Sequence, residues 1–123
     1  MATATSVKVT GIDIHCYLAK DARRATNFYK DVLGLVPTWE EDQGAEFELG
    51  DGSTFGVWKM SDGSWHPSAG VFFAVSDLKE TVAQLKLKGV KFIDPEIFES
   101  NVCHMIGAED TEGNSFMLHQ RKQ

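Results

Sequence analysis

The strongest constraint on this chain is an internal duplication, because a strand–helix–three-strand pattern occurs twice along its length. Residues 51–59 (DGSTFGVWK) match residues 112–120 (EGNSFMLHQ), and the segment before Asp21 matches the segment before Asp77. Two copies are too few for a solenoid or a propeller, whose repeats bury a core only when several are stacked. We therefore expect one domain over residues 1–123, built from two tandem βαβββ modules at residues 7–60 and 69–120.

Local signals place the elements of each module. Residues 7–18 alternate and are rich in β-branched side chains, which predicts a strand. Asp21 and Asp77 are typical helix N-caps, and Gly34 and Gly89 are typical residues at helix ends. The other predicted strands are residues 36–41, 45–49, 54–60, 70–75, 91–98, 102–108 and 115–120. The fold class expected from this order is α+β, with one sheet and both helices on one of its faces.

Composition excludes several classes of protein. The chain has 12 Lys and Arg against 18 Asp and Glu, a formal charge of −6, so it lacks the basic surface that nucleic acid requires. No apolar run approaches the roughly 20 residues of a membrane helix, and the first residues do not resemble a secretory signal. Cys16 and Cys103 lie in apolar runs, so we expect two reduced core thiols and a cytoplasmic protein.

Four features together resemble the vicinal oxygen chelate superfamily, which comprises glyoxalases, bleomycin-resistance proteins and extradiol dioxygenases. They are His15, Asp21, the helix end FYKDVLGL at residues 28–35, and the turn DTEGN at residues 110–114. The likeness extends from about residue 7 to residue 119. It implies that the two modules form a curved mixed sheet around a cleft, with the helices on the outer face. It also implies a homodimer and a small-molecule ligand or substrate.

Strand alternation sorts the side chains between helices and cleft. The row Ile12, Ile14, Cys16 and Leu18 is apolar, so we expect it to pack under the helices. The same reasoning sends Phe47, Phe55 and Val57 under the helices. The side chains then expected in the cleft, as ligand-binding residues, are Asp13, His15, Tyr17, Glu46, Glu48, Thr54, Trp58, Phe73, Met117 and His119.

The resemblance also indicates where a metal would be bound. Metal-dependent members place ligands on the first and fourth strands of each module, which correspond here to His15, Gly56, Val71 and Met117. Only His15 of these is a good ligand for a hard divalent ion, so we expect no standard metal centre and no cofactor. A non-standard site remains as an alternative, in which His15 and His119 would bind a divalent metal with Glu46 or Glu48.

Three functions follow from this pattern of residues. Aromatic faces beside carboxylates suit a planar or cationic ligand, as in the antibiotic-binding, bleomycin-resistance branch of the superfamily. The alternative is a glyoxalase-like lyase or isomerase, or a dioxygenase, for which His15, Glu48 and His119 are the catalytic candidates. The third is a structural module whose cleft is filled by its own side chains. Two positions stay open: whether His104 reaches the cleft, and whether the linker residues Trp65 and His66 cover it.

Overall fold

The computed structural model describes residues 7–122, in which the predicted order of elements occurs twice. The first module contains β1 (His15–Leu18), α1 (Ala22–Asn27), a π-helical turn η1 (Phe28–Val32), β2 (Pro37–Glu41), β3 (Gly44–Glu48) and β4 (Thr54–Trp58). The second contains β5 (Val71–Ala74), α2 (Leu78–Leu87), β6 (Lys91–Phe92), β7 (Phe98–Glu99), β8 (Cys103–Glu109) and β9 (Ser115–Arg121). The α+β prediction is confirmed.

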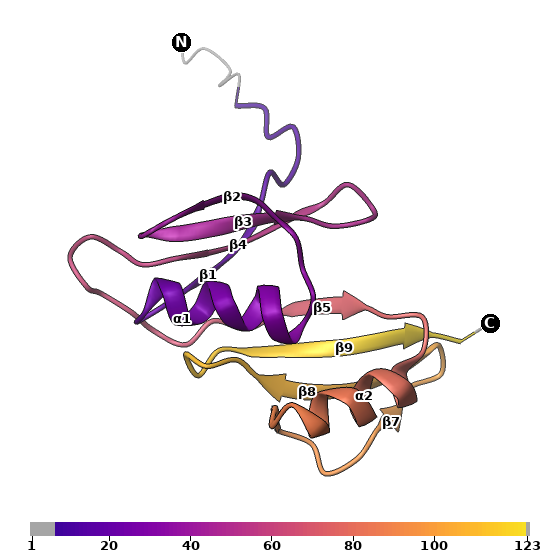
Figure 1. The fold of residues 1–123 in the computed structure, drawn as a ribbon. Coiled ribbons are helices and arrows are strands. Elements are labelled where there is room, and N and C mark those ends of the chain that lie inside the picture. Colours follow the sequence, from indigo (N-terminus) through magenta and orange to yellow (C-terminus); the bar gives the residue numbers. More distant parts are fainter. Residues whose placement is uncertain (1–6, 123) are drawn as a thin grey trace.

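Hydrogen bonding joins the strands of each module into a sheet of its own. The first sheet has the order β1-β4-β3-β2, and the second has the order β5-β9-β8-β6 with β7 also paired to β8 (Figure 1). In each module the first strand runs parallel to the last one, and the other pairs are antiparallel. The predicted mixed sheet is therefore divided into two hydrogen-bonded parts, and β1 and β5 each lie at an edge.

The two helices begin and end where the sequence predicts. The carboxylate of Asp21 accepts the backbone N–H of Arg24 at 3.0 Å, and that of Asp77 accepts the backbone N–H of Glu80 at 3.1 Å. Gly34 and Gly89 follow the helices with φ of 74° and 80°, a region that residues with a Cβ rarely adopt. These signals are local, which explains why sequence alone located them.

A single hydrophobic core lies between the sheets, and α1 with η1 is the element at its centre (Figure 1). The ring of Tyr29 lies 6.3 and 4.8 Å from the rings of Phe47 and Phe55 in the first sheet. It also lies 6.3 Å from both Phe73 and Phe116 in the second sheet. Both sheets therefore turn one face toward the same core, and their other faces point away from it.

The predicted orientation of β1 and β5 is wrong. Tyr17 is only 3% exposed, packs edge-on against Phe55 at 5.3 Å and belongs to the core. Its hydroxyl donates to the Ser115 carbonyl at 2.7 Å and accepts the Val71 backbone N–H at 2.9 Å. Phe73 is 8% exposed and lies in the same core. In β1 the ring of Tyr17 fills more core space than an aliphatic side chain, and its hydroxyl has hydrogen-bond partners. In β5 the row of Phe73 also contains Val71 and Val75, which pack against the core, whereas the other row contains Phe72 and Ala74.

Three other expectations also fail. The strand predicted over residues 7–18 begins only at His15, and residues 91–98 form two short strands separated by a bend. Cys103 is buried as expected, but Cys16 is exposed because it lies on the face of β1 opposite Tyr17. Partial burial and the nearby Glu46 carboxylate raise the pKa of the Cys16 thiol.

The DTEGN turn joins the two modules through buried carboxylates. Glu112, 2% exposed, accepts the backbone N–H groups of Lys20 and Asp21 at 2.9 and 2.8 Å. Asp110 accepts the Tyr29 hydroxyl at 2.7 Å. Burial beside Asp110 raises the pKa of Tyr29, which therefore stays protonated. The turn in the second module thus fixes the start and the middle of the first module's helix.

Candidate functional site

The face of the first sheet that points away from the core carries aromatic and acidic side chains. We define the first outer face as Cys16, Trp39, Glu46, Glu48, Thr54 and Trp58. The strand register places Glu46 opposite Gly56 and Glu48 opposite Thr54. The rings of Trp39 and Trp58 are stacked at 5.8 Å with 20° between their planes. Four of the ten predicted ligand-binding residues therefore share this face: Glu46, Glu48, Thr54 and Trp58.

Trp39 is the member of this face that sequence reasoning missed as a binding residue. It belongs to β2, which is an edge strand of the first sheet. The register between β2 and β3 shifts at Trp39, and this irregularity pairs Trp39 with Glu46. A bulge of this kind is not visible in the sequence, so its stacking on Trp58 could not be predicted.

Two glycines shape the middle of the first outer face. A Cβ at Gly56 would lie 2.8 Å from Ile14 Cδ1, and one at Gly44 would overlap the Val57 carbonyl oxygen. Only glycine fits at Gly44, since a backbone atom cannot move away. The side chains of Ile14 and Glu46 both lie close to Gly56 and take up the space that a larger residue would need.

The second sheet has a corresponding outer face, defined as Phe72, Ala74, Met105, Met117 and His119. Phe72, 54% exposed, contacts the His119 ring edge-on at 5.5 Å. The register pairs Phe72 with Met117 and Ala74 with His119. Met117 and His119 thus point away from the core as predicted, whereas Phe72 stands where Phe73 was expected. Because both sheets use their inner faces for one core, the two outer faces do not face each other within a single chain.

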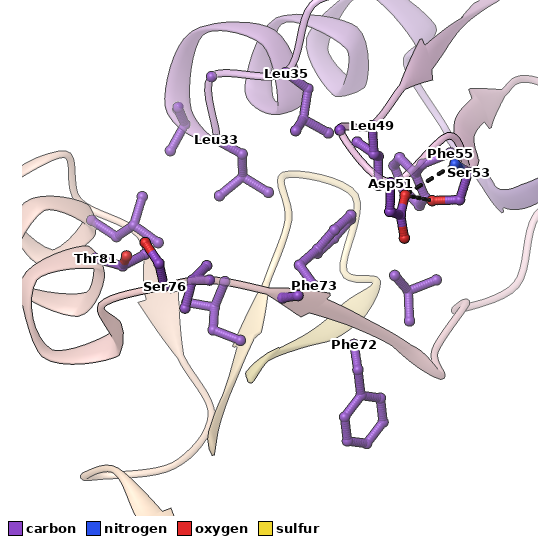
Figure 2. A pocket seen from close by; sticks show the side chains of 18 of the residues that line it. Leu33, Leu35, Leu49, Asp51, Ser53, Phe55, Phe72, Phe73, Ser76 and Thr81 are labelled. Carbon is purple, nitrogen blue, oxygen red and sulfur yellow. Dashed lines mark hydrogen bonds between the residues drawn. The ribbon is translucent and has the colours of Figure 1, made fainter. Parts of the chain in front are cut away.

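An open cavity within the single chain lies between the modules instead. This cavity, about 1000 Å³, is called here the inter-module groove, and Figure 2 shows it. Its walls are apolar and include Leu33, Leu35, Leu49, Phe55 and Phe73. Its rim carries polar side chains, among them Asp51, Ser53, Asp77, Glu80, Thr81 and Lys88. Hydrogen bonds from Ser53 lower the pKa of Asp51, so its carboxylate is charged.

The predicted site residues are therefore divided among five places: the two outer faces, the inter-module groove, the core and the segment before β1. His15 and Phe73 line the groove, and Thr54 of the first outer face also borders it. Tyr17 is in the core, and Asp13 is exposed in the segment before β1. Of the catalytic candidates, His15 lies at the groove, Glu48 on the first outer face and His119 on the second. The structure does not bring these three side chains together.

The donors present do not fit the metal centre that the sequence resemblance indicates. Within residues 7–122, no three His, Cys, Asp or Glu side chains are arranged to hold a metal ion. Gly56 offers no donor atom, Val71 is apolar, and the Met117 thioether is a poor ligand for hard divalent ions. His15 is paired with Phe55 in the register and so stands on the opposite face of the sheet from Glu46. The residues of the alternative metal site are thus separated.

The structure shows the surroundings of His104 and of the linker residue Trp65, whose positions relative to the cleft the sequence left open. His104 is paired with Gln120 and lies 3.6 Å from a Glu99 carboxylate oxygen, on the face of the sheet opposite His119. Trp65 lies beneath the Lys20 ammonium, at 4.0 Å from the ring centroid, and also approaches Gly113. The linker is therefore packed against its own chain through Trp65.

No helix in the described range is long and apolar enough to span a membrane.

Comparison with known proteins identifies a family from the sequence and similar folds among solved structures. A family model described as Glyoxalase/Bleomycin resistance protein/Dioxygenase superfamily matches residues 11–118. No curated protein sequence matches. TnmS3, an antibiotic binding protein from Streptomyces sp. CB03234, has a similar structure with a TM-score of 0.79 at 15% identity, covering 94% of this chain and 99% of that one.

Two further solved structures have the same fold but different described activities. A lactoylglutathione lyase from Agrobacterium tumefaciens gives a TM-score of 0.74 at 16% identity and covers 91% of this chain and 94% of its own. The oxidase ChaP-H2 gives 0.72 at 20% identity and covers 96% of both chains. Likeness at these identities establishes the fold, and the side chains must decide the function.

Proposed function

The chain belongs to the glyoxalase/bleomycin resistance protein/dioxygenase superfamily, and we propose that within it this protein binds a planar or cationic small molecule without the metal centre of its catalytic relatives. The observation that carries the proposal is the stacked Trp39–Trp58 pair beside Glu46 on the first outer face. An indole surface attracts a flat ring by stacking and a cation through its π electrons, and a nearby carboxylate strengthens the second effect.

The donor set supports binding over catalysis. The strand positions at which metal-dependent relatives hold ligands carry glycine, valine and methionine here in addition to His15. The proposed ligand needs no activation, because an aromatic and acidic surface holds it by contact alone. TnmS3, which has the same fold, is described as an antibiotic binding protein, and this supports a small-molecule ligand.

The proposed active form is a homodimer, because one chain leaves both outer faces uncovered. Phe72 is 54% exposed and Trp39 is 38% exposed, although both are large and apolar. Exposed apolar surface of this kind is typical of an interface or a ligand site. A second copy would bring its Phe72–His119 face next to the Trp39–Trp58 face of the first, and two-fold symmetry would repeat this contact, so that two copies enclose two equivalent aromatic clefts. The two free cysteines favour a reducing, cytoplasmic location.

The experiment is a titration with a planar aromatic cation, for which ethidium is a convenient probe, followed by tryptophan fluorescence. A Trp65→Phe background limits the signal to Trp39 and Trp58. We expect saturable quenching at a defined stoichiometry. Trp58→Leu should remove most of it, and Glu46→Gln should weaken binding roughly threefold to tenfold. The matched control Glu96→Gln changes an exposed carboxylate outside both outer faces and should have no effect.

Two results would contradict the proposal. Quenching that does not saturate, or that Trp58→Leu leaves unchanged, would exclude the first outer face as the binding surface. Elemental analysis and thermal melts with Mn, Fe(II), Ni and Zn address the alternative. A metal bound near one per chain and lost in His15→Ala would favour a lyase, isomerase or dioxygenase instead.

A further inference from the structure

Three soft or borderline metal donors lie together on the second outer face. Met105 of β8 is paired with His119 of β9, and Met117 precedes His119 by two residues on the same strand. Residues paired across antiparallel strands have Cβ atoms about 4.5–5.5 Å apart, and alternate residues of one strand lie about 6–7 Å apart. The two thioethers and the imidazole, called here the thioether cluster, therefore rise from three neighbouring positions. All three side chains are half-buried.

Gly107 lets the sulfur of Met117 lie toward β8. It is paired with Met117, and a Cβ at Gly107 would lie 3.2 Å from Met117 Sδ. Because glycine lacks a Cβ, this sulfur occupies the space over β8, the strand that carries Met105. The same Cβ would lie 3.0 Å from Asp94 Oδ2, which accepts the Gly107 backbone N–H at 2.7 Å. A carboxylate is therefore fixed beside the thioethers, which carry no charge themselves.

Two exposed phenylalanine rings border the thioether cluster on opposite sides. Phe98 of β7 is paired with Met105, and Phe72 of β5 is paired with Met117. Phe72 also contacts the His119 ring edge-on at 5.5 Å, and Figure 2 shows it pointing away from the inter-module groove. An apolar shell around a metal site limits the access of water, which favours bonds to weak donors such as thioethers.

We infer that Met105, Met117 and His119 bind one Cu(I) ion. Thioether sulfur is a soft ligand that selects Cu(I), and imidazole also suits copper. Hard ions such as Mg²⁺ and Mn²⁺ prefer carboxylate and carbonyl oxygens, and structural zinc sites use thiolates or several imidazoles, which the thioether cluster does not contain. Neutral donors leave the single positive charge of Cu(I) in place, and the neighbouring Asp94 carboxylate offsets part of it.

The inference goes beyond the proposed function and does not depend on it. The thioether cluster belongs to one sheet of one chain, so it needs neither the aromatic ligand nor a second copy. His15 takes no part in it, because that imidazole lies at the inter-module groove. The ethidium titration is read from Trp39 and Trp58, so its failure would refute only the ligand proposal.

The test is an anaerobic titration of Cu(I) into the full chain carrying Cys16→Ser, with bicinchoninate as a coloured chelator that competes for the ion. This background removes the exposed thiol, which is itself a soft ligand. We expect one Cu(I) bound per chain. Met105→Leu and Met117→Leu keep the size and apolar character of the side chain, so each variant should fold and should weaken binding at least roughly tenfold. His119→Gln should weaken binding by a similar factor.

Two matched controls separate the thioether cluster from other donors of the same kind. Met60→Leu replaces an exposed methionine after β4, and His104→Gln replaces an imidazole on the opposite face of the second sheet. Both should leave the dissociation constant unchanged. Circular dichroism of each variant shows whether it has folded.

NMR of methyl-labelled methionine with Ag(I), which shares the ligand preference of Cu(I), gives an independent readout. The methyl signals of Met105 and Met117 should shift as Ag(I) is added, and that of Met60 should not. The absence of these shifts would overturn the inference. So would Cu(I) that stays bound when both methionines of the cluster are replaced, or that is lost in Cys103→Ala or His15→Ala but kept in the methionine variants.

Discussion

The buried carboxylate of Glu112 holds the two modules together, and its removal should clearly lower the free energy of unfolding. Its Oε1 accepts the backbone N–H groups of Lys20 and Asp21 and an Arg24 N–H. Its Oε2 accepts the Arg24 Nε–H at 2.7 Å and the Thr111 hydroxyl at 2.9 Å. The perturbation is Glu112→Gln, which keeps the size of the side chain and removes its charge.

The expected loss in the free energy of unfolding depends on which hydrogen bonds the glutamine can still accept. Its oxygen still accepts the two backbone N–H groups, but its NH₂ group faces the donors of Arg24 and Thr111. Hydrogen bonds to a charged group contribute about 1.5–3 kcal/mol each. The Arg24 side chain is 50% exposed and regains water, so we expect a loss of about 2 kcal/mol in the free energy of unfolding. For a chain of 123 residues this lowers the melting temperature by about 8 °C.

The pH dependence gives an independent check with a definite sign. Burial alone would raise the pKa of Glu112, but hydrogen bonds from Arg24, Asp21 and Thr111 outweigh it and hold the pKa below its usual range. The unfolded chain therefore binds a proton more readily than the folded one. This contribution to stability is present above the unfolded pKa, about 4.3, and is lost as the pH falls through the lower folded pKa. The Glu112→Gln variant lacks this carboxylate, so it should lose less stability than the parent as the pH falls through this range.

The assay is urea unfolding of the parent and the variant between pH 3 and pH 7 at one fixed protein concentration. Glu99→Gln serves as the control, because Glu99 pairs with Lys122 at 2.9 Å on the exposed surface and its replacement should change stability very little. If Glu112→Gln unfolds like the parent at pH 7 and loses stability with acid at the same rate, the carboxylate does not hold the modules together and the reasoning is refuted.

Three other predictions follow from single contacts. Tyr17→Phe should lower the free energy of unfolding by about 1–3 kcal/mol in urea titrations, since it leaves the backbone groups of β5 and β9 without their hydroxyl partner; an unchanged midpoint would contradict this. Gly44→Ala should prevent normal folding because its Cβ would meet a backbone oxygen, whereas Gly56→Ala meets a movable side-chain end and should stay folded by circular dichroism. In the native chain Cys16 should react with a thiol reagent and Cys103 should not, and the rate should still rise above pH 9 because the pKa of Cys16 is raised.

The elements that the sequence predicted well are those set by local chemistry. Asp21 and Asp77 as caps, and Gly34 and Gly89 as helix ends, depend on the backbone within a few residues. The duplication then supplied the order of the strands, because the same local pattern occurs twice. Phe55 and its neighbours in β4 were placed correctly because one face of that strand is much more apolar than the other.

The faces of β1 were not predictable in the same way. Its two rows compete, one aliphatic and the other containing Tyr17, and alternation alone cannot say which row a distant helix will cover. The Tyr17 row is buried because its ring packs on Phe55 and its hydroxyl bonds two backbone groups of the second module, at Val71 and Ser115, which are 54 and 98 residues away in the chain. The candidate site was unpredictable for a similar reason. Trp39 stacks on Trp58 because of a register shift between β2 and β3, which the sequence does not reveal.

The polar groups in the core explain why the outer faces are available for binding. Tyr17 and Tyr29 reach across to the second module with their hydroxyls, and Glu112 holds the start of α1 from the other side. Apolar packing tolerates several relative positions of two sheets, but these directed bonds are satisfied in only one. In that position the inner faces of the two sheets share one core. Trp58 with its acidic neighbours then lies on the first outer face, and His119 lies on the second. The proposed ligand cleft, built from both surfaces, would therefore require a second chain, so a variant that prevents the proposed dimer should bind no ligand even where every proposed binding residue is intact.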